Sequence, residues 1–540
     1  MLNLIETAEA MVKCLEHENI SVVFGYPGAA ICPFYDYLYK SSIKHILVRQ
    51  EQNGGHAANG YARITGKPAV CIATSGPGAT NLITAIATAY ADSVPLVIIT
   101  GQVSTDQIGR DVFQEADITG SAEPFVKHSF LVKEAEKLPE IFRLAFHIAG
   151  TGRKGPVLID VPFDIQKTMI DFEYPEKVEI MSYKPTTKGN YIQIKKVAQA
   201  IENSEKPLIC AGGGIFSSDC CKELHDFAES LDIPIVTTMM GIGAVRSDCR
   251  LNFGMIGMHG IPAANKAVLD CDLLILIGAR VGDRAVASPS FLAETTKIIH
   301  IDIDPAEIGK NIETDIPLVG DAKTILKQLS EIIKPVKHTP WLDELSSRIK
   351  EPVFAKAPEG YINPKEFIYK LSAKAPENTI ISADVGQNQI WTANYFKVKG
   401  GRFITSGGMG TMGYSIPAAI GAKLASPDSQ VIAVCGDGSL QMQSMELATI
   451  MQNNIPVKII VMTNKRLGMV REVQTRLYEN RQIAVNLDGS PDFIKLAEAY
   501  SIPAIRINNS DEADEAIDRM ISAKTPFFIE CMVSPEESTL

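Results

Sequence analysis

Short apolar runs without polar alternation recur along the whole 540-residue chain and constrain its fold more than any other feature. Strands with one face in water alternate apolar and polar residues, whereas strands covered on both faces read as continuous runs of about five to eight apolar residues. The stretches between the runs are long enough for crossover helices, so we expect an α/β protein with doubly wound parallel sheets. In chain order the runs are SVVFGY, KPAVCIAT, VPLVIIT, GPVLIDV, KPLICAGGG, IPIVTT, CDLLILIG, KIIHIDI, TIISADV, SQVIAVCGDG, VKIIVMTN and PFFIECMV.

Two segments of different composition divide these runs into three groups. Residues 167–190 mix Pro, Lys and Thr, residues 334–364 are rich in Pro, Lys and Glu, and neither shows a core pattern. A chain of this length is also too long for one hydrophobic core. We therefore expect three domains, residues 1–166, 190–333 and 362–540, each built on its own parallel sheet.

Composition and charge exclude several classes of protein. The formal charge of −11 argues against a nucleic-acid or membrane-surface partner, which would call for a basic face. No run of about 18 apolar residues is present, and the N-terminus is acidic and helix-like, unlike a signal peptide. Ten cysteines are scattered without a CxxC pair, which favours a reducing, cytoplasmic setting.

The stretch VIAVCGDGSLQM, residues 431–442, carries the first chemical signal. An apolar run ends at Cys435, Gly436, Asp437 and Gly438 follow, and Ser439 opens a helical pattern. Glycines at a strand end let backbone N–H groups approach a phosphate, and the helix N-terminus adds positive potential. Asp437 would repel a phosphate unless a divalent cation such as Mg²⁺ lay between them. A plain Gly-Asp-Gly turn explains this stretch equally well when it is taken alone.

The next apolar run, in IIVMTNKRLGMVREVQ (residues 459–474), ends just before Asn464. One strand–helix–strand unit would bring Asn464 to the same sheet edge as Asp437, where its amide oxygen could bind the same cation. An acid and an amide at adjacent strand ends are more specific than either motif alone. A surface turn is the alternative interpretation of Asn464.

A third signal lies near the N-terminus, in HILVRQEQNGGHAANGYAR, residues 45–63. Glu51 follows an apolar run and precedes a helical segment rich in Gly and Ala. Close packing of that helix is expected to shield the carboxylate from water, which would suit a group that shares a proton. A solvated glutamate at a strand end is the alternative.

Taken together, these motifs resemble those of a known enzyme family. Gly-Asp-Gly followed by Asn464 is similar to the diphosphate–magnesium motif of thiamine diphosphate (ThDP) enzymes. Over nearly the whole chain, the order of motifs resembles acetohydroxyacid (acetolactate) synthase catalytic subunits. The motifs are FGYPGAA, RQEQNGGHAANGYAR, IATSGPGATN, DSVPLVIITGQV, DVFQE, GPVLIDVP, GMHG, GARVGDR, HIDIDPAEIGKN, PAAIGA and GDGSLQM. Of these, DVFQE, GMHG and HIDIDPAEIGKN are the most discriminating.

The resemblance implies a role for particular residues at a ThDP site. Glu51 is implied as the catalytic residue, hydrogen-bonded to N1′ of the aminopyrimidine, and Met412 as the residue that forces the bent cofactor conformation. Asp437, Asn464 and the backbone carbonyl of Arg466 are implied as Mg²⁺ ligands. The full set implied for ThDP is Gly28, Ala29, Glu51, Pro77, Asn81, Val385, Gly386, Gln387, Asn388, Gly410, Met412, Gly436, Asp437, Gly438, Ser439, Asn464, Leu467, Gly468 and Met469.

The resemblance also implies a flavin site in the central domain and a substrate end. FAD in this family is required but not redox-active in turnover. Phe113, Gln114 and Arg284 are implied at the substrate end, with the Arg284 guanidinium facing the carboxylate of the second acid. The residues implied for FAD are Arg153, Gly212, Gly213, Gly214, Thr238, Met239, His259, Gly278, Ala279, Arg280, Asp283, Asp302, Ile303, Asp321 and Ala322.

By resemblance, the expected reaction is acetolactate synthesis for valine, leucine and isoleucine. Pyruvate is decarboxylated on ThDP, and the hydroxyethyl fragment joins a second 2-oxo acid, either pyruvate or 2-oxobutyrate. A homodimer or dimer of dimers is implied, with Glu51 of one chain serving the cofactor of the other, and a small regulatory subunit can accompany it. Two alternatives stay open: another ThDP-dependent decarboxylase, carboligase or pyruvate oxidase, and a non-catalytic paralogue.

The chain departs from the family pattern at five places. Thr463 replaces the first residue of an Asn-Asn pair, Asn388 stands where many members have His, and Phe163 stands where Lys is usual. Val473 replaces a Trp linked to preference for 2-oxobutyrate, which leaves the acceptor acid open. The sequence also ends at SPEESTL, soon after the last predicted strand, where many relatives continue for some twenty residues as a tail that helps cover the active site.

Overall fold

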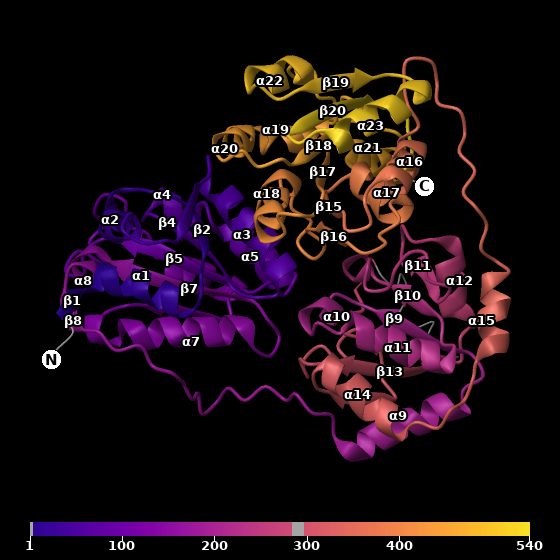
Figure 1. Cartoon of the computed structure of the whole chain (residues 1–540), viewed down its shortest axis with the longest axis horizontal. Helices are drawn as coiled ribbons and strands as arrows, with labels where there is room; N and C mark the ends of the chain where they lie inside the picture. Colours follow the sequence, from indigo (N-terminus) through magenta and orange to yellow (C-terminus); the bar gives the residue numbers. More distant parts are fainter. Residues whose placement is uncertain (1–3, 283, 285–295, 540) are drawn as a thin grey trace.

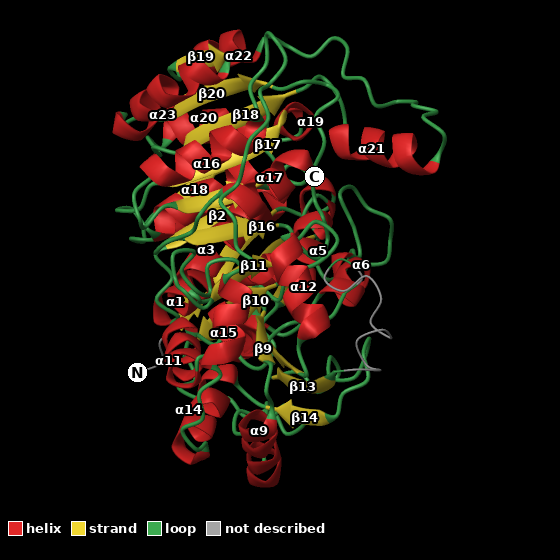
Figure 2. Cartoon of the chain, turned by 90° about the vertical axis from the view of Figure 1, so that its right-hand side faces the viewer, coloured by secondary structure: helices red, strands yellow, loops and turns green. Residues whose placement is uncertain are grey.

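The computed structural model describes residues 4–282, 284 and 296–539. Within these residues, three parallel sheets of six strands each confirm the predicted α/β class with three doubly wound domains. In Figure 1 the N-terminal domain (indigo to purple) lies beside the C-terminal domain (orange to yellow), and the central domain packs below the latter. The turned view in Figure 2 shows helices on both faces of the sheets.

The N-terminal sheet has the strand order β3-β2-β4-β5-β7-β6. Strands β4, β5 and β7 are buried along their whole length, as the uninterrupted apolar runs predict. The strands are β2 (Val22–Tyr26), β3 (Lys44–Leu47), β4 (Ala69–Ala73), β5 (Leu96–Gln102), β6 (His128–Leu131) and β7 (Pro156–Pro162), with β1 (Leu4–Glu6) and β8 (Met169–Asp171) forming a separate antiparallel pair. The helices are α1 (Thr7–His17), α2 (Cys32–Leu38), α3 (Glu51–Thr65), α4 (Pro77–Thr80), α5 (Ile83–Ala91), α6 (Ile118–Ala122), α7 (Leu138–Gly150) and α8 (Phe163–Gln166).

The central sheet has the strand order β11-β10-β9-β12-β13-β14. Its strands are β9 (Pro207–Ala211), β10 (Ile235–Thr237), β11 (Asn252–Met255), β12 (Leu273–Ile277), β13 (Lys297–Asp302) and β14 (Ile316–Val319). The helices are α9 (Tyr191–Asn203), α10 (Gly214–Ser217), α11 (Cys221–Leu231), α12 (Pro262–Asp270), α14 (Ala322–Ile332) and α15 (Thr339–Ser346).

The C-terminal sheet has the strand order β16-β15-β17-β18-β20-β19. Its strands are β15 (Ile380–Ala383), β16 (Arg402–Thr405), β17 (Val431–Gly436), β18 (Lys458–Thr463), β19 (Ala504–Ile507) and β20 (Phe527–Met532). The helices are α16 (Pro364–Lys374), α17 (Gln387–Tyr395), α18 (Ser415–Ala425), α19 (Asp437–Gln441), α20 (Leu447–Gln452), α21 (Gly468–Leu477), α22 (Phe493–Ala499) and α23 (Ala513–Ser522).

Helices α3 and α18 join the N- and C-terminal domains (Figure 1). A Cβ atom on Gly60 of α3 would overlap the backbone of Ala418, and one on Gly421 of α18 would overlap the backbone of Ala57. Glycine is therefore required where the two backbones approach each other. The small residues of α3 thus build a close helix–helix contact, as the sequence predicted.

Part of the second predicted linker is ordered structure. Helix α15 lies within residues 334–364 and packs Trp341, Leu342 and Leu345 into the core of the central domain. The Trp341 indole N–H donates a hydrogen bond of 3.1 Å to the carbonyl of Pro207 at the start of β9. None of the helices in the described part of the chain is long and apolar enough to span a bilayer.

Candidate functional site

Three adjacent strands of the C-terminal sheet end at one edge and start the candidate site. Strands β15, β17 and β18 are neighbours, and a helix begins shortly after each of them, at Gln387, Asp437 and Gly468. Parallel strands place their carboxyl ends together, and each helix N-terminus contributes unpaired N–H groups and positive potential. This edge suits an anionic ligand.

Asp437 is buried at this edge and is 2% exposed. Its two carboxylate oxygens accept hydrogen bonds from the backbone N–H groups of Gly438 (2.9 Å) and Lys465 (2.6 Å). Burial is the main effect on the side chain and raises its pKa to about 6, against the opposing effect of these hydrogen bonds. A carboxylate held this far out of water fits a divalent cation, which would favour its charged form.

The Gln387 side chain links Asn464, a predicted metal ligand, to Glu472 and to the C-terminal tail. Its Oε1 accepts a hydrogen bond of 3.0 Å from Asn464 Nδ2, and its Nε2 donates to Glu472 and, at 2.8 Å, to the carbonyl of Glu537. Asn464 is therefore held with its Oδ1 toward the Arg466 N–H, which donates to it at 3.0 Å. A Cβ atom on Gly468 would overlap Gln387 Oε1, so a larger residue there would displace this hydrogen-bonded side chain.

Gly436 and Gly438 lie at the same edge, where β17 ends and α19 begins. A Cβ atom on Gly438 would lie 3.0 Å from Leu467 Cδ2 and 3.6 Å from Met412 Cε, so these side chains lie directly over it. On Gly436 a Cβ atom would lie 3.3 Å from Asn388 Oδ1. Ser439 donates back to the Gly436 carbonyl at 3.1 Å. The structure thus gathers the residues predicted for the diphosphate side, while Val385, Gly410 and Met469 extend from it to the wall of a nearby cavity.

The last described residues fold back onto this edge, which the sequence did not indicate. Glu536 forms ion pairs of 3.0 Å with both Arg466 and Arg471. Thr539 donates its backbone N–H to Glu472 at 2.8 Å, so Glu472 binds both the tail and Gln387. The polar segment SPEESTL shows no pattern that would reveal this contact, because it depends on tertiary packing alone.

The residues predicted for the pyrimidine side gather on the N-terminal domain. Glu51 begins α3, and its Oε2 accepts a hydrogen bond of 2.9 Å from Asn81 Nδ2. A Cβ atom on Gly78, next to Pro77, would lie 3.3 Å from Glu51 Oε1, and one on Gly28, next to Ala29, would lie 2.5 Å from Thr74 Cβ. The expected shielding of Glu51 is incomplete, because the side chain is only half-buried, whereas the middle of α3, residues 53–60, is buried.

The substrate candidates lie on two domains. Gln114 has a left-handed backbone (φ 60°) and packs on Gly76, so it borders the Glu51 group. Phe113 is 86% exposed. Arg284 lies on the central domain, with its Nη1 3.5 Å from Met258 Sδ, at the cavity wall. Among the described residues, no hydrogen bond or ion pair joins the Glu51 group to the Asp437 group.

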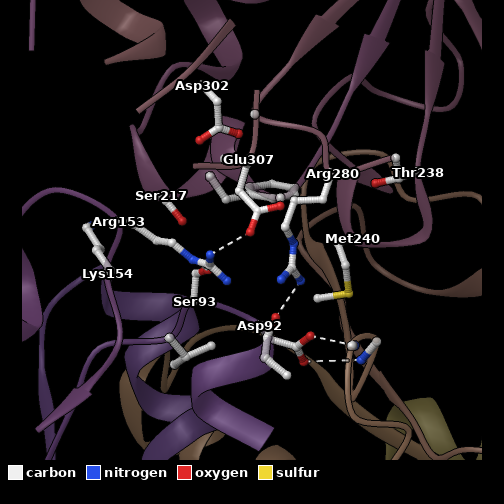
Figure 3. Close-up of a pocket in the computed structure, with 18 of the residues that line it drawn as sticks. Asp92, Ser93, Arg153, Lys154, Ser217, Thr238, Met240, Arg280, Asp302 and Glu307 are labelled. Carbon is white, nitrogen blue, oxygen red and sulfur yellow. Dashed lines mark hydrogen bonds and ion pairs between the residues drawn. The ribbon is translucent and has the colours of Figure 1, made fainter. Parts of the chain in front are cut away.

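A cavity of about 990 Å³ lies where the three domains meet. Figure 3 shows its polar side chains pointing inward, among them Arg153, Arg280, Asp302 and Glu307. Arg153 donates to Glu307 at 2.8 Å and to Asp304 at 3.1 Å. Most of the residues predicted for FAD line it: Arg153, Gly213, Gly214, Thr238, Met239, His259, Gly278, Arg280, Asp302, Ile303, Asp321 and Ala322.

Comparison with known proteins now decides the family. The chain matches the family models described as thiamine pyrophosphate enzyme, N-terminal TPP binding domain (residues 5–121), central domain (194–329) and C-terminal TPP binding domain (384–531). It is 49% identical to the probable acetolactate synthase large subunit of Methanocaldococcus jannaschii, covering 98% of this chain and 92% of that protein. The chain belongs to the acetolactate synthase large-subunit family of thiamine pyrophosphate enzymes.

Other members of the family are nearly as similar over the same length. The acetolactate synthase large subunit of Buchnera aphidicola is 44% identical, with 96% of this chain and 92% of that protein covered. The acetolactate synthase of Arthrospira platensis is 42% identical, with 98% and 94% covered. The resemblance inferred from the motifs is thereby confirmed.

The predicted flavin residues that do not line the cavity have other positions. Gly212 packs against Gly278 and Ala279, where a Cβ atom would overlap the backbone. This close approach supports the cavity wall from behind. Asp283 lies outside the described residues.

Arg402 is a cavity residue that sequence reasoning missed. It starts β16, lines the cavity, and stacks its guanidinium 4.1 Å from the centroid of the Phe216 ring. Burial, together with the nearby Arg63, lowers its pKa to about 9, and its Nε finds no hydrogen-bond partner among the described residues. An arginine in this state fits a phosphate-bearing ligand in the cavity. In the sequence it looks like an ordinary charged residue at a strand start.

Proposed function

We propose that this chain is the catalytic subunit of an acetolactate synthase. It would decarboxylate pyruvate and join the hydroxyethyl fragment to a second 2-oxo acid, pyruvate or 2-oxobutyrate, in branched-chain amino acid biosynthesis. The relatives named acetolactate synthase, which match nearly the whole chain, support the reaction class. The observation that carries the proposal is the buried group formed by Asp437, Asn464 and Gln387 at the carboxyl edge of the C-terminal sheet.

The diphosphate half of the site would bind the cofactor through a metal ion. Asp437, Asn464 and the Arg466 carbonyl would hold Mg²⁺, and the N–H groups at the starts of α17 and α19 would face the diphosphate. Met412 and Leu467, which cover Gly438, would limit the volume left for the thiazolium ring. When bound, ThDP supplies a thiazolium that accepts the electron pair released on decarboxylation. The protein supplies orientation and a site from which water is excluded.

Glu51 would act at the pyrimidine half of the site. Asn81 fixes one carboxylate oxygen, which leaves Oε1 to share a proton with the aminopyrimidine ring. Pro77 and Gly78 hold the backbone close beneath this carboxylate. Glu51 is therefore the residue that we assign to proton transfer.

A homodimer would bring the two halves together. Tyr26 is 40% exposed beside the Glu51 group, and Met442 is 53% exposed on the C-terminal domain. Exposed apolar groups beside two incomplete half-sites fit the surface of a second copy. In such a dimer Glu51 would serve the cofactor held by the partner chain, and a dimer of dimers is a further form.

The cavity would hold FAD without redox turnover. Its volume, its glycine loop at Gly213 and Gly214, and the guanidinium groups of Arg153 and Arg402 on its wall support a dinucleotide with a diphosphate. Arg284 borders this cavity and, together with Gln114 and Phe113 of the N-terminal domain, would meet the second acid. The relatives' designation as large subunits supports a small regulatory subunit, and ten free cysteines support a cytoplasmic location.

The test is to incubate the purified protein with ThDP, Mg²⁺, FAD and pyruvate, with and without 2-oxobutyrate. We expect 2-acetolactate, together with 2-aceto-2-hydroxybutyrate when 2-oxobutyrate is present. Acetaldehyde or acetyl phosphate as the main product would instead identify a decarboxylase or a pyruvate oxidase on the same scaffold. Absence of turnover with both cofactors bound would identify a non-catalytic paralogue.

A further inference from the structure

The loop of residues 406–414 carries two of the proposed ThDP residues and is held by groups from two domains. Gly410 and Met412 lie in the middle of this loop. Toward its far end, Asp384, which is fully buried, accepts the N–H groups of Gly413 (3.0 Å) and Ser415 (2.8 Å). This anchor belongs to the same domain as the loop.

The other anchor comes from the N-terminal domain. Asp92 caps the end of α5, and its Oδ1 accepts the Gly408 N–H at 2.7 Å while its Oδ2 accepts the Gly407 N–H at 3.1 Å. The Asp92 side chain is 0% exposed and forms an ion pair of 2.6 Å with Arg63. Hydrogen bonds to a buried charged group are stronger than those between neutral groups, so this carboxylate fixes the loop firmly.

The same point lies on the wall of the cavity, as Figure 3 shows. Asp92, Gly407 and Gly408 are all lining residues, and Arg280 of the central domain donates to the carbonyl of Ala91 beside Asp92. A Cβ atom on Gly407 would overlap Met240 Sδ, so the central domain also touches the loop here. All three domains therefore meet at Gly407 and Gly408 in direct contact.

We propose that Asp92 is a positioning residue that couples the cavity to the thiamine site. A ligand that fills the cavity presses on a wall whose backbone is hydrogen-bonded to Asp92. Because packed interiors transmit strain, fixing this wall fixes Gly410 and Met412 four residues or fewer downstream of Gly408. This inference rests on the proposed function, in which FAD fills the cavity and ThDP binds beside Met412. It gives a non-redox flavin a definite role.

The measurable consequence is a coupling between two affinities. Binding of FAD should tighten ThDP binding, and by linkage ThDP should tighten FAD binding by the same factor. We expect a factor of about ten in the unmodified protein. A purely structural ion pair between Asp92 and Arg63 would change stability without producing any such factor.

The experiment is calorimetric titration of ThDP, at saturating Mg²⁺, into flavin-free and FAD-saturated protein. Asp92→Asn should reduce the coupling factor from about ten to below two. The matched control is Asp304→Asn, which removes a carboxylate paired with the cavity residue Arg153, away from the loop. This control should weaken FAD binding but leave the coupling factor between FAD and ThDP binding at about ten.

A second variant covers the outcome in which Asp92→Asn fails to fold because Arg63 loses its partner. In Gly408→Ala, the new Cβ atom would lie 2.9 Å from the Ala91 carbonyl and 3.0 Å from Asp92 Oδ1, which would push the loop off Asp92 while the ion pair stays. Gly408→Ala should therefore reduce the coupling factor to below two, as Asp92→Asn does. An undiminished factor in either folded variant, or a factor of one in the unmodified protein, would overturn the inference. Protein that binds both cofactors independently and makes acetolactate refutes only this inference, whereas protein that binds neither refutes the proposed function as well.

Discussion

The two halves of the proposed active site differ in how completely a single chain builds them. On the diphosphate side, Asp437 is 2% exposed and Asn464 7%, and each is fixed by hydrogen bonds. On the pyrimidine side, Asn81 is exposed and Glu51 is half-buried. The first half is thus preorganised by the fold, while the second requires another surface.

Because of this difference, substitutions in the diphosphate half and in the pyrimidine half should affect different quantities. A buried carboxylate without a cation is costly, so the diphosphate half should control cofactor affinity and respond to metal. The half-buried Glu51 side chain contributes little packing, so the pyrimidine half should control the chemical step with little effect on folding.

Glu51→Gln should lower acetolactate formation by about 100- to 10,000-fold, the range typical of a lost acid–base group. ThDP affinity and the thermal midpoint should stay close to those of the unmodified protein, because the amide keeps the size and the contact with Asn81. Steady-state product assays and ThDP titration measure both. As a control, Glu140→Gln makes the same change at an exposed site in the first turn of α7, in the same domain. It should leave acetolactate formation and ThDP affinity unchanged. Turnover within threefold of the unmodified protein would remove Glu51 from the mechanism.

Asp437→Ala should weaken Mg²⁺-dependent ThDP binding by about 10- to 100-fold. Burial disfavours the charged carboxylate, so the metal-free variant should be at least as stable as the metal-free parent. Titration of ThDP with and without Mg²⁺, together with thermal unfolding, tests both parts. Asp428→Ala, at an exposed aspartate of the same domain, is the control. Unchanged ThDP affinity would place the metal site elsewhere.

The sequence predicted the fold class and much of the diphosphate side for a physical reason. Strands buried on both faces leave uninterrupted apolar runs, and residues at the ends of parallel strands must meet at one edge. Asp437 and Asn464 could therefore be placed together before the structure was known. Helix α15 was missed because the apolar pattern around Trp341 spans only two turns and is flanked by Pro and Lys.

Residues whose role depends on contacts between domains could not be predicted in this way. In the sequence, Asp92 looks like an ordinary polar residue after a helix, and Arg402 like a charged strand start. Their burial and their partners arise only when three domains pack together. The contact of Thr539 with Glu472 is of the same kind, since it joins residues far apart in the chain.

The pH dependence of metal binding should follow Asp437. In the metal-free protein its pKa is raised to about 6, so the side chain is protonated below that pH and charged above it. A proton then competes with Mg²⁺ below about pH 6, and ThDP affinity should fall by up to about tenfold for each further pH unit. Stability of the metal-free protein should fall as pH rises from about 4 to about 6, between the ordinary pKa of the side chain and its raised value, because the buried carboxylate becomes charged. Titrations between pH 5 and 8 test this, and a flat profile would contradict it.

The smallest expected effect concerns the choice of the second acid. Val473 is 44% exposed on α21, at the position where the resemblance implies a Trp linked to preference for 2-oxobutyrate. Val473→Trp would add an apolar wall against the extra methyl group of 2-oxobutyrate, a contact of about 1 kcal/mol or roughly fivefold in product ratio. Competition assays with both acids, resolving the two acetohydroxy products, measure that ratio. Val470→Trp, one turn earlier on the same helix and 45% exposed, is the matched control and should leave the ratio unchanged. Equal shifts in both variants would mean that α21 affects acceptor choice through its general bulk and not through a contact at position 473.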